Sequence, residues 1–162
     1  MRRICLFIFA SYCIIYAKVN KWARTVNTDN LSMLSSFFSV AADAGGNVYM
    51  AGGIWGAGSY DFGGGVKITM RHGGGVLVKY DSSGASRWAR TVNADNPSSS
   101  SSFYPVAVDA GGNVYMVCGP GPGSYDFGGG VRITLRYQSG VLVKYDSLGT
   151  AKWARMVTLA LD

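Results

Sequence analysis

Two copies of the tripeptide Tyr-Asp-Phe, each followed by three glycines, are the first candidates for a binding site in this sequence. The aromatic rings could stack against a sugar while the aspartate accepts hydrogen bonds from its hydroxyl groups. Alternatively, the aspartate could contribute to a cation site. The same residues could instead be structural, with phenylalanine filling a core and aspartate holding the glycine turn, and we prefer this interpretation. The candidate ligand contacts in these tripeptides are Tyr60, Asp61, Tyr125 and Asp126.

Trp55 is a further candidate ligand contact. It lies in a glycine-rich stretch and has no counterpart in the second copy of the repeat described below. It therefore has no evident part in the repeated core and could be exposed. By contrast, Trp22, Trp88 and Trp153 occupy matching positions, and we expect them to pack against neighbouring strands.

The sequence offers no set of residues typical of an enzyme. His72 is the single histidine, the matching position in the second copy is Tyr137, and no nearby motif supplies a carboxylate partner. The patterns HExxH, CxxC and GxSxG are absent, and the glycines at 63–65 are not followed by the Lys-Ser/Thr pair of a phosphate loop. We expect no catalytic residue and no cofactor.

Aspartate and asparagine flank two glycine turns in a way that resembles part of a calcium loop. The pairs are Asp43 with Asn47, and Asp109 with Asn113. Ca²⁺ prefers about six to eight oxygen ligands, and too few carboxylates converge here to supply them. We expect these residues to cap turns and to bind no metal.

The charge pattern argues against nucleic acid as a partner. The formal net charge is +6, but Arg2 and Arg3 at the N-terminus contribute two of these charges. The other lysines and arginines do not form a basic stripe with interleaved aromatic residues, which is the usual footprint of a nucleic-acid-binding surface. We expect a mildly basic, solvated surface.

Residues 1–17 have the features of a signal peptide. A short basic start precedes an apolar run over residues 4–17, which is shorter than the ~20 residues that a membrane-spanning helix needs. Cleavage before Lys18 would leave Cys118 as the only cysteine, inside an apolar run and therefore expected to be buried and inert. The alternative is an uncleaved N-terminal anchor, and both interpretations predict an extracytoplasmic protein.

A repeat organises the rest of the chain. The segment GSYDFGGGVKIT at residues 58–69 returns as GSYDFGGGVRIT at 123–134, and Trp22, Trp88 and Trp153 are spaced by 66 and 65 residues. We divide the chain into a leader over 1–17, an extra strand with its linker over 18–36, a first repeat over 37–93, a serine-rich linker over 94–102 and a second repeat over 103–162.

Each repeat reads as a series of short strands. Glycine is abundant at 23 residues, which is unfavourable inside helices, and no segment has helical periodicity over a useful length. Aspartate and glycine mark tight turns at 43–46 and 81–84. In the first repeat we predict strands at 37–42, 47–52, 76–80 and 86–92, with a weaker candidate at 66–70. In the second repeat, the strands at 103–108, 113–118 and 151–157 correspond to these.

The repeat resembles the bacterial β-propeller repeat family often labelled SBBP. The matching segments are VAADAGGNVYMAG, YDFGGGV, VLVKYDSSG and RWARTV, and a second time VAVDAGGNVYM, YDFGGGV, VLVKYDSLG and KWARM. The resemblance implies an all-β fold with four-stranded antiparallel, propeller-like blades, and an exported or surface protein. It implies no catalytic residues.

Two blades and one extra strand would make an incomplete propeller, because propellers close with about four to eight blades. The chain could be part of a longer array, several copies could complete a ring, or the two units could simply stack. We expect a non-catalytic structural or binding module at the cell envelope, with a protein or glycan partner. The alternative function is a carbohydrate-binding, lectin-like propeller assembled from several chains, in which Trp55, Tyr60 and Tyr125 would be exposed near clefts.

Overall fold

The computed structural model describes residues 22–28, 34–95 and 102–157. Within these ranges the regular secondary structure is entirely β, as the glycine-rich, strand-like sequence predicts. The predicted leader, and parts of the two linkers, lie outside the described residues.

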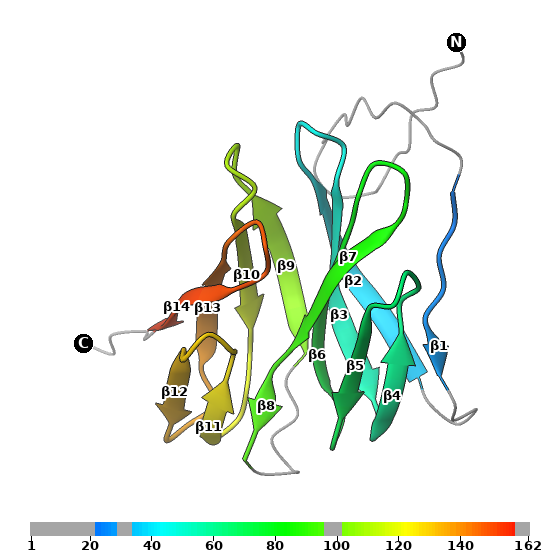
Figure 1. The fold of residues 1–162 in the computed structure, drawn as a ribbon. Coiled ribbons are helices and arrows are strands. Elements are labelled where there is room, and N and C mark those ends of the chain that lie inside the picture. Colours follow the sequence, from blue (N-terminus) through cyan, green and yellow to red (C-terminus); the bar gives the residue numbers. More distant parts are fainter. Residues whose placement is uncertain (1–21, 29–33, 96–101, 158–162) are drawn as a thin grey trace.

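Two four-stranded antiparallel sheets form the body of the protein, one for each repeat (Figure 1). We call residues 34–92 unit 1 and residues 102–157 unit 2. The sheet of unit 1 has the order β2 (Leu34–Ala42), β3 (Val48–Trp55), β6 (Gly74–Tyr80), β7 (Ser86–Thr91). The sheet of unit 2 has the order β9 (Phe103–Val108), β10 (Val114–Cys118), β13 (Gly140–Tyr145), β14 (Ala151–Val157).

A small hairpin is inserted between the second and third strands of each large sheet. In unit 1 it comprises β4 (Gly58–Asp61) and β5 (Lys67–Met70), and in unit 2 β11 (Gly123–Asp126) and β12 (Arg132–Leu135). Each hairpin gains a third strand from the residues that precede its unit: β1 (Asn27–Thr28) pairs with β4, and β8 (Asn93–Ala94) pairs with β11. The glycine-rich stretch is thus mainly a hairpin with a separate sheet, and not an extra edge of the large one.

The extra strand predicted at the start of the 18–36 segment does not form in its described part. Residues 22–26 have no strand pairing, and only Asn27–Thr28 pair with β4. In unit 1 the matching residues begin at Trp88 in β7, and they form a strand because they pair with β6 of the same sheet. The segment over 22–28, which we call the leading segment, has no such sheet among the described residues. Residues 18–21 lie outside them.

The turns form for the reasons that the sequence suggests. In the turn over residues 81–84, the Asp81 carboxylate accepts hydrogen bonds from the backbone N–H groups of Ser83 (2.9 Å) and Ala85 (3.0 Å). The turn ends at Gly84, whose φ of +82° is costly for any residue with a Cβ atom. Residues 146–149 repeat this turn, and Asp146 accepts the matching bonds from Leu148 and Thr150. We call these two segments the acceptor turns.

The core of unit 1 lies between one face of its large sheet and its own hairpin. Alternate residues of each strand face this core, as expected for a pleated sheet. The buried members are Ile54, Tyr60, Phe62, Ile68, Met70, Val76, Val78, Tyr80 and Ala89, with Trp22 and Val26 of the leading segment packed against them.

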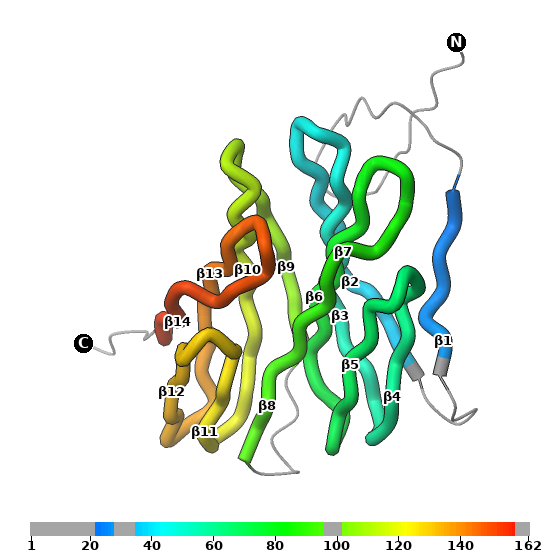
Figure 2. Tube along the Cα trace, viewed as in Figure 1, coloured from blue at the N-terminus to red at the C-terminus, as the bar shows by residue number. Residues whose placement is uncertain are grey.

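The second apolar cluster is continuous across the two units. It combines the equivalent core of unit 2 with residues from the other face of the unit 1 sheet. The unit 1 members are Tyr49, Ala51, Leu77, Trp88 and Val92. From unit 2, the ring of Phe103 lies over Gly75 of β6, where an added Cβ would sit only 2.3 Å from a ring carbon. The tube in Figure 2 shows β9 running beside β6 at this contact.

The contact between Phe103 and Gly75 predicts a difference between two equivalent glycines. Gly75→Ala would force the methyl group into the Phe103 ring, and such overpacking costs about 1–3 kcal/mol. At Gly140, the matching position in unit 2, the only described atom that an added Cβ meets is the Val157 Cβ, at 3.7 Å. Gly140→Ala should therefore change the free energy of unfolding by no more than about 0.5 kcal/mol. Urea unfolding of both variants measures the difference, and equal losses would contradict the packing described.

Candidate functional site

The two tyrosines predicted as ligand contacts are part of the core. Tyr60 and Tyr125 are each 1% exposed. Their hydroxyl groups donate hydrogen bonds to the carbonyl oxygens of Gly56 (3.0 Å) and Gly121 (2.8 Å). The expectation that these rings are exposed near clefts is therefore wrong, because each ring is needed to fill the space between the hairpin and its large sheet.

The two aspartates of the same tripeptides hold the glycine turns of the hairpins. Asp61 accepts a hydrogen bond from the N–H of Gly63 at 2.8 Å, and Asp126 accepts the same bond from Gly128 at 2.8 Å. Asp61 also pairs with Lys67 across the hairpin (3.1 Å), as Asp126 does with Arg132 (2.8 Å). Together with the burial of Phe62 and Phe127, this confirms the packing and turn interpretation of the motif.

Trp55 is exposed, as expected, and lies at the end of β3 beside two other exposed aromatic rings. Phe38 of β2 contacts it edge-on, with ring centroids 6.1 Å apart and an interplanar angle of 70°. Phe38 also stacks on Tyr104 of β9, at 6.0 Å and 19°. The exposed fractions are 44% for Trp55, 51% for Phe38 and 47% for Tyr104. We call these three residues the aromatic row.

The row is encoded by the repeat, because Phe38 and Tyr104 occupy the same position in the two units. Each is an extra residue at a β-bulge: Phe37 pairs with Gly52 and Ser39 with Ala51, which leaves Phe38 without a partner on β3. The register of β9 shifts at the matching place. A bulge redirects side chains locally, so that Phe37 faces inward and Phe38 outward. The sequence signal for the row, an aromatic pair at the start of both repeats, does not by itself show which ring of the pair is exposed.

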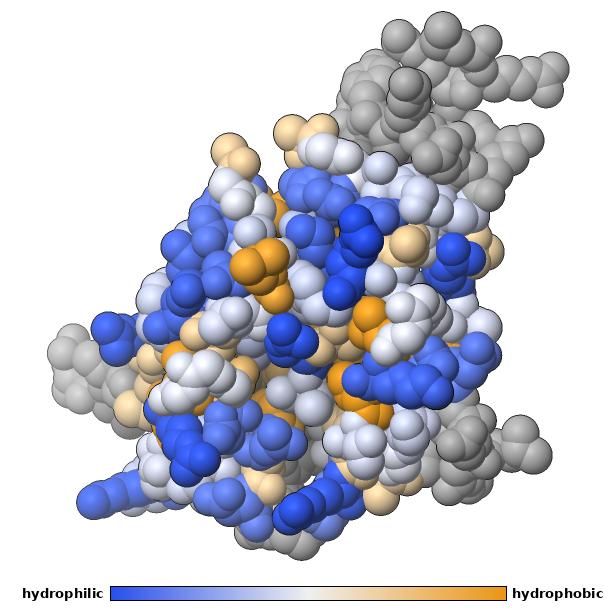
Figure 3. All heavy atoms as spheres, in the orientation of Figure 1, coloured by the Kyte–Doolittle hydropathy of each residue, from blue (hydrophilic) through white to orange (hydrophobic). Residues whose placement is uncertain are grey.

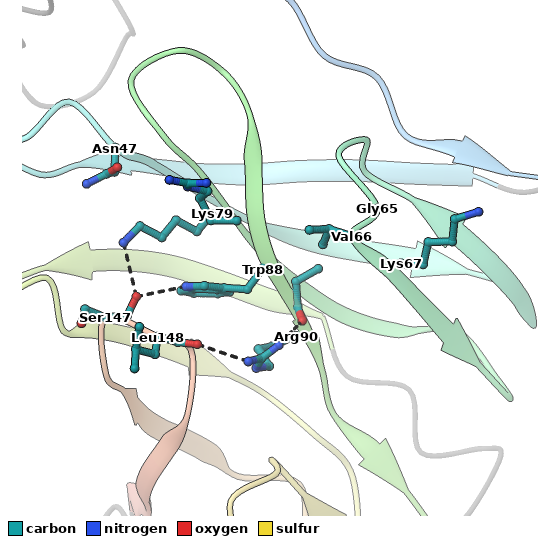
Figure 4. Close-up of a pocket in the computed structure, with 11 residues that line it drawn as sticks. Asn47, Gly65, Val66, Lys67, Lys79, Trp88, Arg90, Ser147 and Leu148 are labelled. Atoms are coloured by element: carbon teal, nitrogen blue, oxygen red, sulfur yellow. Dashed lines mark hydrogen bonds between the residues drawn. The ribbon is translucent and has the colours of Figure 1, made fainter.

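The joint between the units forms a shallow groove of about 720 Å³. In Figure 4 the indole N–H of Trp88 and the ammonium group of Lys79 both point to the carbonyl oxygen of Ser147, with donor–acceptor distances of 3.1 and 3.3 Å. Arg90 donates to the carbonyl oxygens of Gly149 (2.5 Å) and Leu148 (3.2 Å). Three side chains from unit 1 thus bind the backbone of one acceptor turn in unit 2.

The basic groups along this groove are already engaged. Lys67 pairs with Asp61 at 3.1 Å and Arg87 pairs with Asp81 at 3.3 Å, while Lys79 and Arg90 bind the acceptor turn. The groove therefore holds the two units together and does not offer free cationic groups to a ligand. Figure 3 shows the face of the molecule that is seen in Figure 1, with hydrophilic side chains around small, separate apolar spots.

The leading segment repeats the joint on unit 1. The Nε of Arg24 donates to the carbonyl oxygen of Gly84 at 2.6 Å, as Arg90 does to Gly149. The indole of Trp22 lies over Gly84, and that of Trp88 over Gly149, so closely that an added Cβ would sit 2.5 or 2.8 Å from the ring. A Trp-x-Arg sequence therefore docks on an acceptor turn at two places in this chain.

The other candidates for chemistry serve the fold. Both carboxylate oxygens of Asp109 accept hydrogen bonds from Asn113, Gly111 or Tyr115, and Asp43 caps its turn in the same way. Cys118 is fully buried, which raises the pKa of its thiol to about 12, so it is protonated and unreactive at neutral pH. In the described part of the chain, no three His, Cys, Asp or Glu residues are grouped so as to hold a metal ion.

No protein-family model matches this chain. No curated protein matches it either. Among the residues that the structure describes, no helix has the length and apolar character to cross a bilayer.

The turn caps predict a loss of stability in acid. The hydrogen bonds from Asn113, Tyr115 and Gly111 lower the pKa of Asp109 in the folded state below 3.8. Its contribution to stability is therefore complete above the unfolded-state pKa, about 3.9, and is lost as the pH falls through the lower folded-state value. Asp109→Asn should lower the melting temperature at pH 7 and flatten its fall between about pH 5 and 3.

Asp95→Asn is the matched control, because no hydrogen bond to the Asp95 carboxylate is found within the described ranges. This variant should leave the melting temperature at pH 7 unchanged. Identical pH profiles for Asp109→Asn and the parent would show that the cap does not contribute as described.

Proposed function

We propose that this chain is a non-catalytic binding module of an exported, β-propeller-type repeat array, and that it binds carbohydrate through the aromatic row. The observation that carries the proposal is the stack of Phe38 on Tyr104 with Trp55 at its edge, because three large rings remain exposed side by side. Large aromatic residues are normally buried, and an exposed group of them is typical of a binding surface.

The repeat array is supported by the way in which the units meet. Two four-stranded antiparallel sheets from consecutive repeats lie next to each other, with β2 beside β9, their first strands. Consecutive sheets of this kind, joined in series, are the building plan of a propeller. The resemblance of the repeats to the SBBP family agrees with this plan.

The non-catalytic role is supported by the hydrogen bonds that the aspartate carboxylates make within turns. The aspartates with lowered pKa values within the described residues are hydrogen-bonded into turns, as Asp61, Asp81 and Asp146 illustrate. Such carboxylates are held in their charged form and are poor proton donors or acceptors near neutral pH.

Carbohydrate is the ligand class that best fits the row. A flat aromatic surface packs against the C–H face of a sugar ring while the sugar hydroxyl groups remain in water. Single-stranded nucleic acid also stacks on aromatic rings, but it requires a positively charged groove along its backbone. The strands that carry the row are β2, β3 and β9, and their sequences LSSFFSVAA, VYMAGGIW and FYPVAV contain neither lysine nor arginine.

The row predicts which aromatic substitutions affect binding. Titration of the protein with neutral polysaccharides and their oligosaccharides, followed by calorimetry, should show saturable binding. Trp55→Ala and Tyr104→Ala should each weaken it at least tenfold, which corresponds to about 1.4 kcal/mol. Both residues are exposed, so the melting temperature should change little.

Tyr137→Ala is the matched control for this experiment, because Tyr137 is 78% exposed and lies outside the row. It should leave binding unchanged. A parent protein that binds none of the saccharides tested would overturn the carbohydrate proposal and favour a purely structural module. Equal losses from all three substitutions would place the site elsewhere.

The export part of the proposal rests on residues 1–17, which lie outside the described residues. Their basic start and apolar run of fourteen residues predict cleavage before Lys18. N-terminal sequencing of the protein recovered from the extracytoplasmic fraction should therefore begin at Lys18. A protein recovered from the membrane with Met1 intact would support an anchor, and recovery from the cytoplasm would contradict export.

A further inference from the structure

The chain contains one more docking sequence than it has acceptor turns in the described residues. The sequence Trp-x-Arg occurs at 22–24, 88–90 and 153–155. The first binds the acceptor turn of unit 1 and the second binds that of unit 2. Among the described residues, Arg155 has no hydrogen-bond or ion-pair partner, which leaves the third docking sequence free.

The free docking sequence already has the geometry of the one in use. Trp153 packs on Tyr115 with ring centroids 6.2 Å apart and an interplanar angle of 55°, and Trp88 packs on Tyr49 at 6.1 Å and 56°. Lys144 lies 5.2 Å from the centroid of Tyr115, as Lys79 lies 5.1 Å from that of Tyr49. We call this side of unit 2, which includes β13 and β14, the open face.

Among the described residues, the open face also has unfilled space for an aromatic ring, which we call the seat. At the joint within the chain, Phe103 fills the space above Gly75. Gly140 is the equivalent of Gly75 on the open face, and among the described residues only Val157 approaches the position of its missing Cβ, at 3.7 Å. A phenylalanine from another unit can therefore occupy the same place.

Apolar residues on the open face are exposed where their equivalents are buried. Val157 is 55% exposed, whereas Val92 in unit 1 is 7% exposed. Tyr115, Val117 and Leu142 are half-buried, and their equivalents in unit 1 are fully buried against unit 2.

Unit 1 carries a surface that complements the open face. Phe37 and Val40 on β2 are the equivalents of Phe103 and Val106, which are buried at the joint. Val40 is 45% exposed and Val106 only 9%. Phe37 is half-buried on the core of unit 1, beside Trp22 and Val26 of the leading segment, whereas Val40 stays exposed.

We propose that the open face of unit 2 binds unit 1 of a second copy of this chain, with Trp153 and Arg155 replacing Trp22 and Arg24 on the acceptor turn at 81–84. This inference rests on the repeat-array part of the proposed function. Phe37 of the second copy then lies over Gly140, and Arg155 donates to the carbonyl oxygen of Gly84. The contact is head-to-tail, so successive copies form a closed ring or an open filament.

Competition from the leading segment weakens this contact, and the burial of apolar surface strengthens it. The leading segment competes from within the same chain, which gives it an effective concentration of about millimolar order. A whole unit covers more apolar surface than the leading segment does, including β2 and the seat at Gly140. The new contact lacks one hydrogen bond of the joint within the chain, since Ser39, which accepts from the N–H of Val106 at 3.1 Å, corresponds to Pro105 in unit 2. Assembly should therefore depend on protein concentration.

The test is sedimentation velocity of the full chain over a range of concentrations. The parent protein should form multiples of its 17.2 kDa mass as the concentration rises. Gly140→Leu should weaken assembly at least tenfold, because the added side chain fills the seat for Phe37 and has room in the free protein. Arg155→Ala should weaken it too, whereas Arg24→Ala should strengthen it by releasing the acceptor turn of unit 1.

Arg132→Ala is the matched control, because Arg132 lines the side of unit 2 that faces unit 1, together with Asn93 and Ala94. All variants share residues 1–17, so any association through that segment is common to them and cancels in the comparison. A parent protein that stays monomeric at every concentration, or a Gly140→Leu variant that assembles normally, would overturn the inference. Saccharide binding by a monomeric Gly140→Leu variant would keep the proposed carbohydrate function even if the assembly proposal failed.

Discussion

The structure depends on the burial of both faces of the unit 1 sheet. In unit 1 one face is covered by the hairpin of the same unit, through residues such as Phe62 and Tyr80. The other face carries Leu77 and Trp88, which are buried only because unit 2 lies against them. A repeat of this kind therefore cannot bury all of its own apolar surface, and each unit needs a neighbour on one side.

The neighbour is held by the backbone of a turn. An aspartate fixes the shape of each acceptor turn through its carboxylate, which leaves the carbonyl oxygens at the end of the turn pointing outward. These carbonyl oxygens accept hydrogen bonds from the guanidinium groups of Arg24 or Arg90. The turn ends in a glycine, and because glycine has no Cβ atom an indole can lie directly on the turn. Apolar burial thus provides most of the attraction, and the charge-assisted hydrogen bonds set the register.

Comparison of equivalent positions separates residues that maintain the repeat from residues that are free for another role. Asp61 and Asp126 make the same turn bond and the same ion-pair type in both units, so they belong to the architecture. Phe38 and Tyr104 are also equivalent, yet both remain exposed and contact each other across the units. Their exposure follows from the bulge, which turns both side chains outward, and the strand pairing of the large sheets does not require this bulge.

The strands and turns were determined by the sequence, because alternation, glycine and aspartate act over a few residues. The large-sheet strands formed near the predicted ranges, and the turns at 43–46 and 81–84 formed where predicted. Long-range packing decided the rest. It buried Tyr60 and Tyr125, left the segment at 22–26 without a strand partner, and brought Phe38, Tyr104 and Trp55 together from three strands. No local pattern contains these contacts, since they arise only when one sheet lies against the next.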